Sequence, residues 1–187
     1  MTVNNSTGLI DSAVPVCWPT ALLSSDCDVL CEQFRGVPLT NGNTIGDYEQ
    51  GRKSGVHLLK LTDMTANSRA CLDSVRQKCC TVFDFDIRDT EAIVQYARYG
   101  VDDYFNWHLD SGMGVNRDRK LSISIQLSES SDYSGGDLEF YPGYRPARSR
   151  NRGAAIAFAP FVLHRVTPVL SGVRESLVFW LSGPPFR

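Results

Sequence analysis

Apolar and polar residues alternate with a period of two through much of the second half of this chain. The clearest example covers residues 121–127, where leucine and isoleucine alternate with serine and glutamine. Successive side chains of a β-strand point to opposite faces, so this segment predicts a strand with one apolar and one polar face. We expect the apolar set to pack beneath helices and the polar set to face either the interior of a barrel or solvent. The two sets are Leu121, Ile123, Ile125 and Leu127 on one face, and Ser122, Ser124 and Gln126 on the other.

Eight further segments carry strand patterns, separated by turns that contain glycine and proline. Many short strands of this kind are typical of a β-sandwich or barrel rather than of a parallel sheet. Residues 36–55 are rich in glycine and asparagine, and they predict turns with at most a short strand. The expected strands cover residues 56–61, 81–87, 93–99, 104–110, 138–140, 154–159, 164–170 and 175–181.

Two segments in the first half have helical periodicity instead. Residues 22–34 predict a helix capped by Ser24 or Ser25, and residues 63–79 predict a second helix capped by Asp63. The apolar stripes are Cys27, Leu30, Cys31 and Phe34 in the first helix, and Cys71, Leu72, Val75 and Cys79 in the second.

Helices placed this early in a chain have no sheet of their own to cover, so they must pack against the strands that follow. A length of 187 residues is enough for one domain with a sizeable core. We therefore expect a single, mainly β domain with flanking helices over residues 1–187. Residues 1–80 would form a helical support region and residues 81–187 the β core.

The composition excludes some classes of function but adds little to the fold prediction. Hydrophobic residues make up 42% of the chain and charged residues 21%, as in ordinary globular proteins. The 19 basic and 21 acidic residues give a net charge of −2, which argues against a general nucleic-acid-binding protein. The sequence shows neither a secretory signal nor an apolar run of membrane-spanning length. We therefore expect a cytoplasmic protein without a membrane segment, whose six cysteines are reduced thiols rather than disulfides.

The residues that could carry chemistry gather around a short His-x-Asp motif. His108 and Asp110 stand two positions apart at the end of a predicted strand, so their side chains point the same way. The chain has three histidines. His57 has no carboxylate near it in the sequence and is interpreted as an ordinary strand histidine, which makes His164 the third candidate ligand. Two histidines and one carboxylate leave positions open on a metal, as in non-haem Fe(II) oxygenases.

A possible carboxylate-binding pair follows the distal histidine. Arg174 and Ser176 share one face of the last predicted strand with Val178 and Trp180. An arginine fork with a hydroxyl two residues on can bind a carboxylate. The alternative is a charged surface residue, but the apolar neighbours of Arg174 favour burial, and a buried arginine needs an anionic partner.

Taken together, these motifs resemble those of the Fe(II)- and 2-oxoglutarate-dependent dioxygenases, in particular the prolyl 4-hydroxylase-like branch with its PKHD-type hydroxylases. The resemblance is carried by the His-x-Asp motif, the segment 153–169 around the distal histidine, the Arg-x-Ser pair and the segment 133–140 with its Gly-Gly-Asp sequence. It covers residues 80–187 well and the first half in outline. It implies a double-stranded β-helix, a cupin-like jelly roll, with the N-terminal helices packed on one sheet.

The resemblance also implies a set of site residues. His108, Asp110 and His164 would hold Fe(II), with open positions for 2-oxoglutarate and O₂. Arg174, helped by Ser176, would bind the distal carboxylate of 2-oxoglutarate, and these four groups would form the catalytic core.

A tyrosine shortly before the His-x-Asp strand donates to the same carboxylate in the family. Tyr99 is our first choice for this role and Tyr96 the second. Gln126 is expected to reach the carboxylate of 2-oxoglutarate at the metal, and Leu138 and Trp180 are expected in the wall of the pocket.

The implied reaction is hydroxylation of a C–H bond with release of succinate and CO₂. The leading substrate is a prolyl residue of a peptide or protein, followed by an amino-acid-like small molecule, and L-ascorbate is a further expected cofactor. Asp110 favours hydroxylation because related halogenases lack this carboxylate. Residues 112–120 and 141–152 are the loops expected to meet substrate.

Two other functions stay open. One is oxidative demethylation of nucleic acid, although the alkylation-repair relatives carry a second arginine after the distal histidine that this chain lacks. The other is a non-catalytic barrel that binds a metal or a carboxylate as a sensor.

Overall fold

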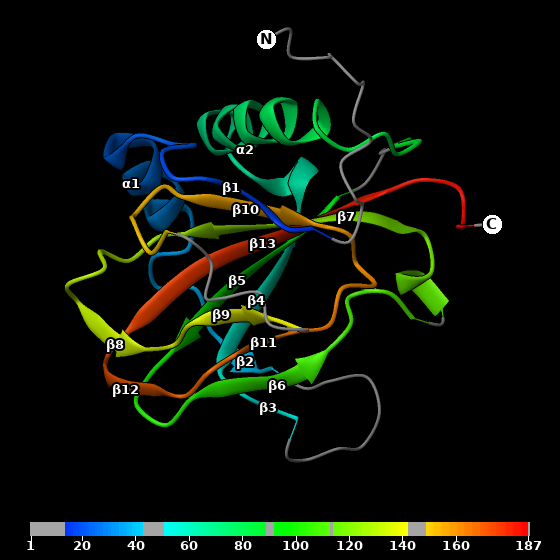
Figure 1. Cartoon of the computed structure of the whole chain (residues 1–187). Coiled ribbons are helices and arrows are strands. Elements are labelled where there is room, and N and C mark those ends of the chain that lie inside the picture. The colour runs from blue at the N-terminus through cyan, green and yellow to red at the C-terminus, as the bar shows by residue number, and fades with distance from the viewer. Residues whose placement is uncertain (1–13, 43–50, 89–91, 113, 142–148, 187) are drawn as a thin grey trace, which may run out of the picture.

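The computed structural model of the chain describes residues 14–42, 51–88, 92–112, 114–141 and 149–186. Two antiparallel sheets face each other, and two helices cover the outer face of the larger sheet (Figure 1). This arrangement is the jelly roll with flanking helices that the sequence predicts. Within the described part of the chain, no helix is both long and apolar enough to cross a membrane.

The larger sheet has seven strands and forms the frame of the molecule. Its central strands are β7, β13 and β5, which are the longest and carry the cleanest alternation. The strand order is β1 (Val16–Trp18), β10 (Ala155–Phe158), β7 (Arg119–Gln126), β13 (Arg174–Ser182), β5 (Ile93–Tyr99), β4 (Gly55–Lys60) and β2 (Thr40–Asn41).

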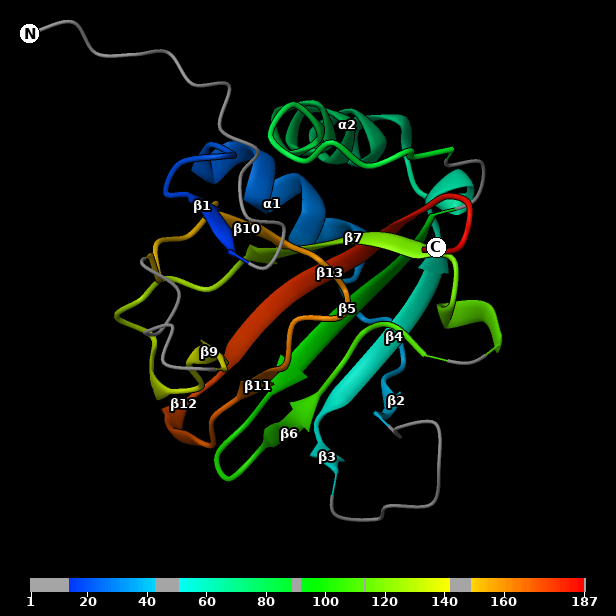
Figure 2. The same cartoon turned by 45° about the vertical axis from the view of Figure 1, so that its right-hand side comes forward.

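The smaller sheet lies across the barrel from the large one (Figure 2). It carries the strand with the His-x-Asp motif next to the strand with the distal histidine. Its order is β3 (Arg52–Lys53), β6 (Tyr104–His108), β11 (His164–Val166) and β9 (Leu138–Phe140), and a separate pair joins β12 (Val169–Gly172) to β8 (Tyr133–Gly135).

The alternation along β7 determines what each face of the large sheet contacts. Its apolar side chains are fully buried beneath α1 (Ser24–Gln33) and α2 (Ala66–Cys80), together with the apolar stripes of both helices. Its serines and Gln126 are also buried, but on the inner face that looks towards the small sheet. Of the two alternatives that the sequence left for the polar set, the barrel interior is therefore the correct one.

The helix starts differ from the predictions. Helix α1 begins at Ser24, but its N-terminus is held by Asp26, whose carboxylate accepts a hydrogen bond of 3.0 Å from the Leu23 N–H. Helix α2 is capped by the Thr65 hydroxyl, which accepts from the Ser68 N–H, whereas the predicted cap Asp63 lies in the short 3₁₀ helix η1 (Leu61–Asp63). A second 3₁₀ turn, η2 (Gly114–Asn116), lies in the loop before β7.

Two strand predictions were wrong. Residues 81–87 form no strand, because their alternation reflects packing rather than pairing. Phe83 is buried in the outer core and stacks on Phe85, and no strand in the described part of the chain pairs with them. The expected strand at 164–170 is divided into β11 and β12, since Thr167 and Pro168 turn the chain from the small sheet to the β8 pair.

Candidate metal and cosubstrate site

His108, Asp110 and His164 come together at one end of the barrel. Their ligand atoms all lie within 4.8 Å of one another. The Nε2 atom of His108 is 3.7 Å from Asp110 Oδ1, and that of His164 is 3.7 Å from Asp110 Oδ2. The antiparallel register pairs the two histidines directly across β6 and β11, which explains how residues so distant in the sequence meet.

Each ligand side chain is held by a second group. The Nδ1–H of His108 donates to the Asn106 carbonyl at 2.7 Å, and that of His164 donates to the Val162 carbonyl at 2.8 Å. These bonds place the proton on Nδ1 and leave both Nε2 lone pairs free for a metal. Asp110 lies two residues beyond the end of β6, in a bend that its N–H fixes by donating to the Pro160 carbonyl.

The Asp110 carboxylate is oriented from β7. The Ser122 hydroxyl donates to its Oδ2 at 2.6 Å, while Arg119 donates to its backbone carbonyl at 2.9 Å. The Arg119 guanidinium stacks on the Trp180 ring at 3.8 Å. The Trp180 indole N–H has no partner in good hydrogen-bond geometry, although it is close enough to Asp110 to help lower the pKa of that carboxyl.

The ionisation states of this group suit a metal site. Burial, reinforced by the neighbouring imidazole of His164, lowers the pKa of His108 to about 3, so the His108 imidazole is neutral near pH 7. Burial alone raises the pKa of Asp110, but His164, His108 and the Ser122 hydroxyl outweigh it and hold that pKa below its usual value. Two imidazole nitrogens and one carboxylate are the donor set of a non-haem Fe(II) centre, so these residues fit the predicted ion.

A second polar pocket inside the barrel contains the arginine that the sequence predicts to be buried. Arg174 is 4% exposed, and its Nη1 donates to the Ser176 hydroxyl at 3.3 Å. No described carboxylate forms an ion pair with it. A buried cation without an anionic partner is costly, so this pocket fits a carboxylate ligand.

Gly136 makes room for this arginine. Its φ is +62°, and an added Cβ would lie 3.0 Å from Arg174 Cδ. The Gly-Gly-Asp segment therefore lets the chain pass close to the guanidinium while adopting a left-handed conformation that favours glycine.

The structure separates the two candidate tyrosines. Tyr99 points into the barrel, where its ring centre lies 5.4 Å from the Arg174 guanidinium carbon. Tyr96 lies on the outer face, where it stacks on Phe34 and donates a hydrogen bond to Glu175. The prediction that Tyr96 contacts the cosubstrate therefore has to be corrected: residues three apart on a strand point to opposite faces.

The other predicted pocket residues are all on the inner side. Gln126 and Leu138 line the pocket of Arg174, and Trp180 stands nearer to Asp110. His57 is half-buried on β4 and contacts the Pro38 carbonyl, away from the predicted metal ligands. Of the predicted substrate loops, residues 113 and 142–148 lie outside the described residues.

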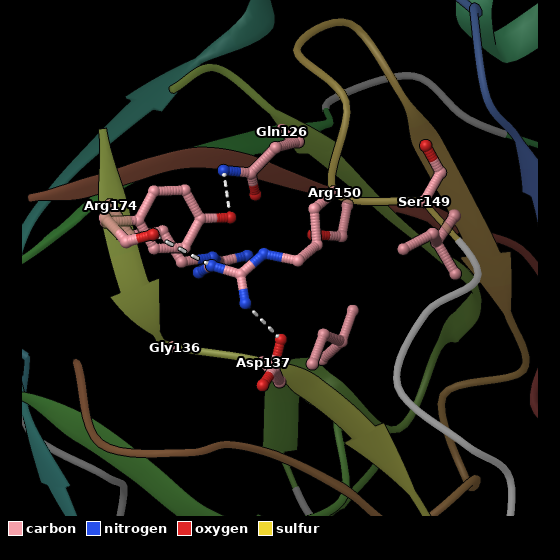
Figure 3. A pocket seen from close by; sticks show the side chains of 10 residues that line it. Gln126, Gly136, Asp137, Ser149, Arg150 and Arg174 are labelled. Carbon is pink, nitrogen blue, oxygen red and sulfur yellow. Dashed lines mark hydrogen bonds and ion pairs between the residues drawn. The ribbon is translucent and has the colours of Figure 1, made fainter. Parts of the chain in front are cut away.

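The sequence did not predict three further residues of this pocket. Arg150 crosses it between the Gln126 amide and the Asp137 carboxylate (Figure 3). It forms an ion pair with Asp137 at 2.7 Å and lies 4.4 Å above the Tyr133 ring, while Gln126 donates to the Tyr133 hydroxyl at 3.0 Å. Arg150 stands among several arginines in a basic segment, so nothing local distinguishes it.

Comparisons with known proteins agree with this geometry. A model of the 2OG-Fe(II) oxygenase superfamily matches residues 94–182. A PKHD-type hydroxylase of Synechococcus sp. strain CC9605 is 32% identical over 148 residues, which cover 78% of this chain and 67% of that protein. Other curated PKHD-type relatives are matched over about two fifths of their length, 39% for the protein of Synechococcus sp. strain CC9902.

Solved structures share the fold at low sequence identity. A prolyl 4-hydroxylase of Pseudomonas putida superposes with a TM-score of 0.70 at 19% identity, over 91% of this chain and 92% of that one. A prolyl hydroxylase of Trichoplax adhaerens, in complex with a peptide fragment of the hypoxia-inducible factor oxygen degradation domain, gives 0.69 at 15% identity, over 90% and 83%.

Proposed function

Because this chain belongs to the 2OG-Fe(II) oxygenase superfamily, in the branch of the PKHD-type hydroxylases, we propose that it hydroxylates a C–H bond at the expense of 2-oxoglutarate and O₂. The observation that carries the proposal is the convergence of two sites in one barrel. Three side chains that could hold a metal ion stand at one end, and a buried arginine without an anionic partner among the described residues lies deeper inside. Iron bound there supplies the oxidative chemistry that couples decarboxylation of 2-oxoglutarate to hydroxylation.

His108, Asp110 and His164 would hold the iron on one side and leave its other positions open for ligands. The Ser122 hydroxyl and the two backbone carbonyls behind the imidazoles would keep these three ligands oriented. Because the site is buried, it also limits access of water to the reacting groups.

Arg174 and Ser176 would bind the distal carboxylate of 2-oxoglutarate. The guanidinium supplies a charged fork, and the hydroxyl two residues later adds a donor on the same face of β13. Tyr99 stands on the neighbouring strand, paired with Arg174 in the register, and would add its hydroxyl. Gln126 and Leu138 would complete the polar and apolar walls of the same pocket.

We infer that the substrate is a prolyl residue of a peptide or protein, with an amino-acid-like molecule as the second candidate. Support comes from the PKHD-type relatives and from the shared fold with prolyl hydroxylases, one of which was solved with a bound peptide. The face made by Arg119 and Trp180 beside Asp110 is where we expect the substrate to approach. L-ascorbate would serve as an added reductant.

The proposal is tested with purified protein, Fe(II), ascorbate and 2-oxoglutarate, by measuring succinate. Arg174→Ala should raise the KM for 2-oxoglutarate by about 100-fold, because it removes a buried, charged hydrogen-bonding group that would contact the carboxylate. Arg35→Ala is the matched control, since Arg35 is exposed and its ion-pair partner among the described residues is Glu32. An unchanged KM in Arg174→Ala would exclude this arginine from the cosubstrate site.

The substrate is identified in a second experiment. The protein is incubated with libraries of proline-containing peptides, free amino acids and methylated single-stranded oligonucleotides, and products that gain one oxygen atom or lose a methyl group are sought by mass spectrometry. A hydroxylated prolyl peptide supports the proposal. Metal and 2-oxoglutarate binding with no turnover in any library would instead indicate a sensor.

A further inference from the structure

Arg52 is a cation inside the same barrel to which the metal and cosubstrate roles assign no function. It lies on the short strand β3, at the edge of the small sheet. Its guanidinium is held by three hydrogen bonds: Nε donates to Ser54 Oγ at 2.7 Å, Nη1 to Gln95 Oε1 at 3.2 Å and Nη2 to the Tyr99 hydroxyl at 3.3 Å. Two of these acceptors lie on β5 of the large sheet and the third, Ser54, lies between β3 and β4, so the planar fork has one defined orientation.

The same guanidinium lies over an aromatic ring that contacts the metal ligand. Its carbon is 4.5 Å from the centre of Phe105, its direct partner in the β3–β6 register. Phe105 in turn stacks flat on His108, with ring centres 3.4 Å apart and planes 13° from parallel. The three groups form a continuous stack, in which the position of the arginine limits the position of the imidazole.

The bond to Tyr99 has a separate consequence. A phenol has one proton to donate, and its oxygen here accepts from Arg52. Among the described residues the hydroxyl makes no donated hydrogen bond, so its proton remains available to a ligand. Tyr99 is 3% exposed and stands beside Arg174, so that ligand would be one bound inside the barrel.

We propose that Arg52 is a positioning residue that orients His108 through the Phe105 ring and Tyr99 through a direct hydrogen bond. One side chain thereby aligns the metal centre with the cosubstrate pocket. This inference rests on the proposed function, because it assigns His108 to the metal and Tyr99 to 2-oxoglutarate. A purely structural Arg52 would only attach β3 to its neighbours, and its loss would lower stability without changing either affinity.

Two calorimetric titrations separate these roles. The first titrates the metal-free protein with Mn(II), and the second titrates the Mn(II)-saturated protein with 2-oxoglutarate, both well below the unfolding temperature. Arg52→Ala should raise both dissociation constants about tenfold, the usual effect of losing a group that orients a ligand. Arg52→Lys keeps the charge over Phe105 but not the three-way fork, so it should restore metal binding more than cosubstrate binding.

Variants that remove only one of the two contacts, the one with Phe105 or the one with Tyr99, test each route separately. Phe105→Leu should weaken Mn(II) binding and leave 2-oxoglutarate binding nearly unchanged, whereas Tyr99→Phe should do the reverse. Arg52→Ala combined with Tyr99→Phe should weaken 2-oxoglutarate binding no more than the stronger single change, because both remove the same contact.

A second perturbation leaves Arg52 chemically intact. A Cβ on Gly42 would lie 2.7 Å from Arg52 Nε and 3.0 Å from its Cδ, so Gly42→Ala must displace the guanidinium. This variant should reproduce a weaker form of the Arg52→Ala effect, about threefold on each constant.

The outcomes distinguish a failure of the proposed function from a failure of the positioning role of Arg52. If the unaltered protein binds neither Mn(II) nor 2-oxoglutarate, the proposed function fails. If it binds both, and Arg52→Ala lowers only the unfolding temperature while both constants stay as they were, the positioning role is wrong and the proposed function stands.

Discussion

The side chains of β7 that point towards the helices differ in chemistry and in partners from those that point into the barrel. On the outer side Leu121, Ile123 and Ile125 are fully buried against α1, α2 and the neighbouring strands. On the inner side Ser122 donates to the Asp110 carboxylate, a proposed metal ligand, and Gln126 donates to Tyr133. Both sets of side chains are buried. Burial of the outer set removes apolar surface from water, whereas the polar groups of the inner set are buried together with their hydrogen-bond partners.

The neighbouring strand β13 repeats the division. Leu177, Phe179 and Leu181 join the outer core, while Arg174 and Ser176 face inward. The two faces therefore separate stability from chemistry within single strands. Substitutions on the outer face should change the free energy of unfolding, and substitutions on the inner face should change ligand binding.

The largest effect is expected at the metal ligand on the inner side. Asp110→Ala removes the one anionic ligand, so we expect activity to fall by about a thousandfold or more, with loss of metal binding. Stability without metal should change little, because the change also removes a buried charge. Succinate formation and Mn(II) titration measure the effect, with Asp73→Asn on the surface of α2 as the matched control. Activity within tenfold of the unaltered protein would remove Asp110 from the metal site.

The outer face is tested by a pair of adjacent residues. Ile123→Ala leaves a cavity in the core under the helices and should cost about 3 kcal/mol of unfolding free energy, with an unchanged KM for 2-oxoglutarate. Ser124→Ala, one position along and on the inner face, should cost less than about 1 kcal/mol. Urea unfolding measures both. Equal losses in the two variants would contradict the division between the faces.

A smaller effect is expected at Ser122, which touches no ligand directly. Ser122→Ala leaves Asp110 Oδ2 without its hydroxyl donor, so the dissociation constant for Mn(II) should rise about tenfold. Ser171→Ala is the control, since Ser171 is an exposed serine whose hydroxyl forms a hydrogen bond with Ser134 in the β12–β8 pair. If both variants bind Mn(II) equally well, Ser122 has no role in orienting the carboxylate.

Alternation along strands was sufficient to separate the apolar and polar sets of β7 and to predict that Arg174 is buried, but it did not decide whether the polar set faces the barrel interior or solvent. It placed His108 and Asp110 on one face, whereas His164 was chosen because the chain has three histidines and His57 has no carboxylate near it in the sequence, and only the register of β6 with β11 shows why the two histidines meet. Alternation failed at residues 81–87, because a coil packed against a core can show the same period as a strand. It should have decided against Tyr96, which has the opposite parity to Tyr99 on β5.

The residues that the sequence did not predict contact side chains on other strands and loops. Arg52 and Arg150 carry no motif of their own, and contacts with other parts of the chain define their roles. Asp137 belongs to the Gly-Gly-Asp sequence, but that sequence does not indicate its ion pair with Arg150. Arg52 contacts Gln95 and Tyr99 of β5 only because β3 and β5 lie on facing sheets. A pattern read along one strand contains no information on such pairings.

The last and smallest effect concerns ionisation beneath the helices. Burial raises the pKa of the Cys79 thiol from 9.0 to about 12. The thiol has a higher pKa in the folded protein than in the unfolded chain, so ionisation of Cys79 favours unfolding. The stability that the protonated thiol contributes is therefore fully present below pH 9 and is lost as the pH rises towards 12. Between pH 7 and pH 10 the unaltered protein should therefore lose about 1 kcal/mol more unfolding free energy than Cys79→Ala. Urea unfolding at the two pH values measures the difference, and 2-oxoglutarate binding at pH 7 should be the same in both proteins, because Cys79 lies in the outer core. Parallel losses in the two proteins would show that the thiol ionises as readily in the folded state as in the unfolded chain, and that the apolar face excludes water less completely than its burial indicates.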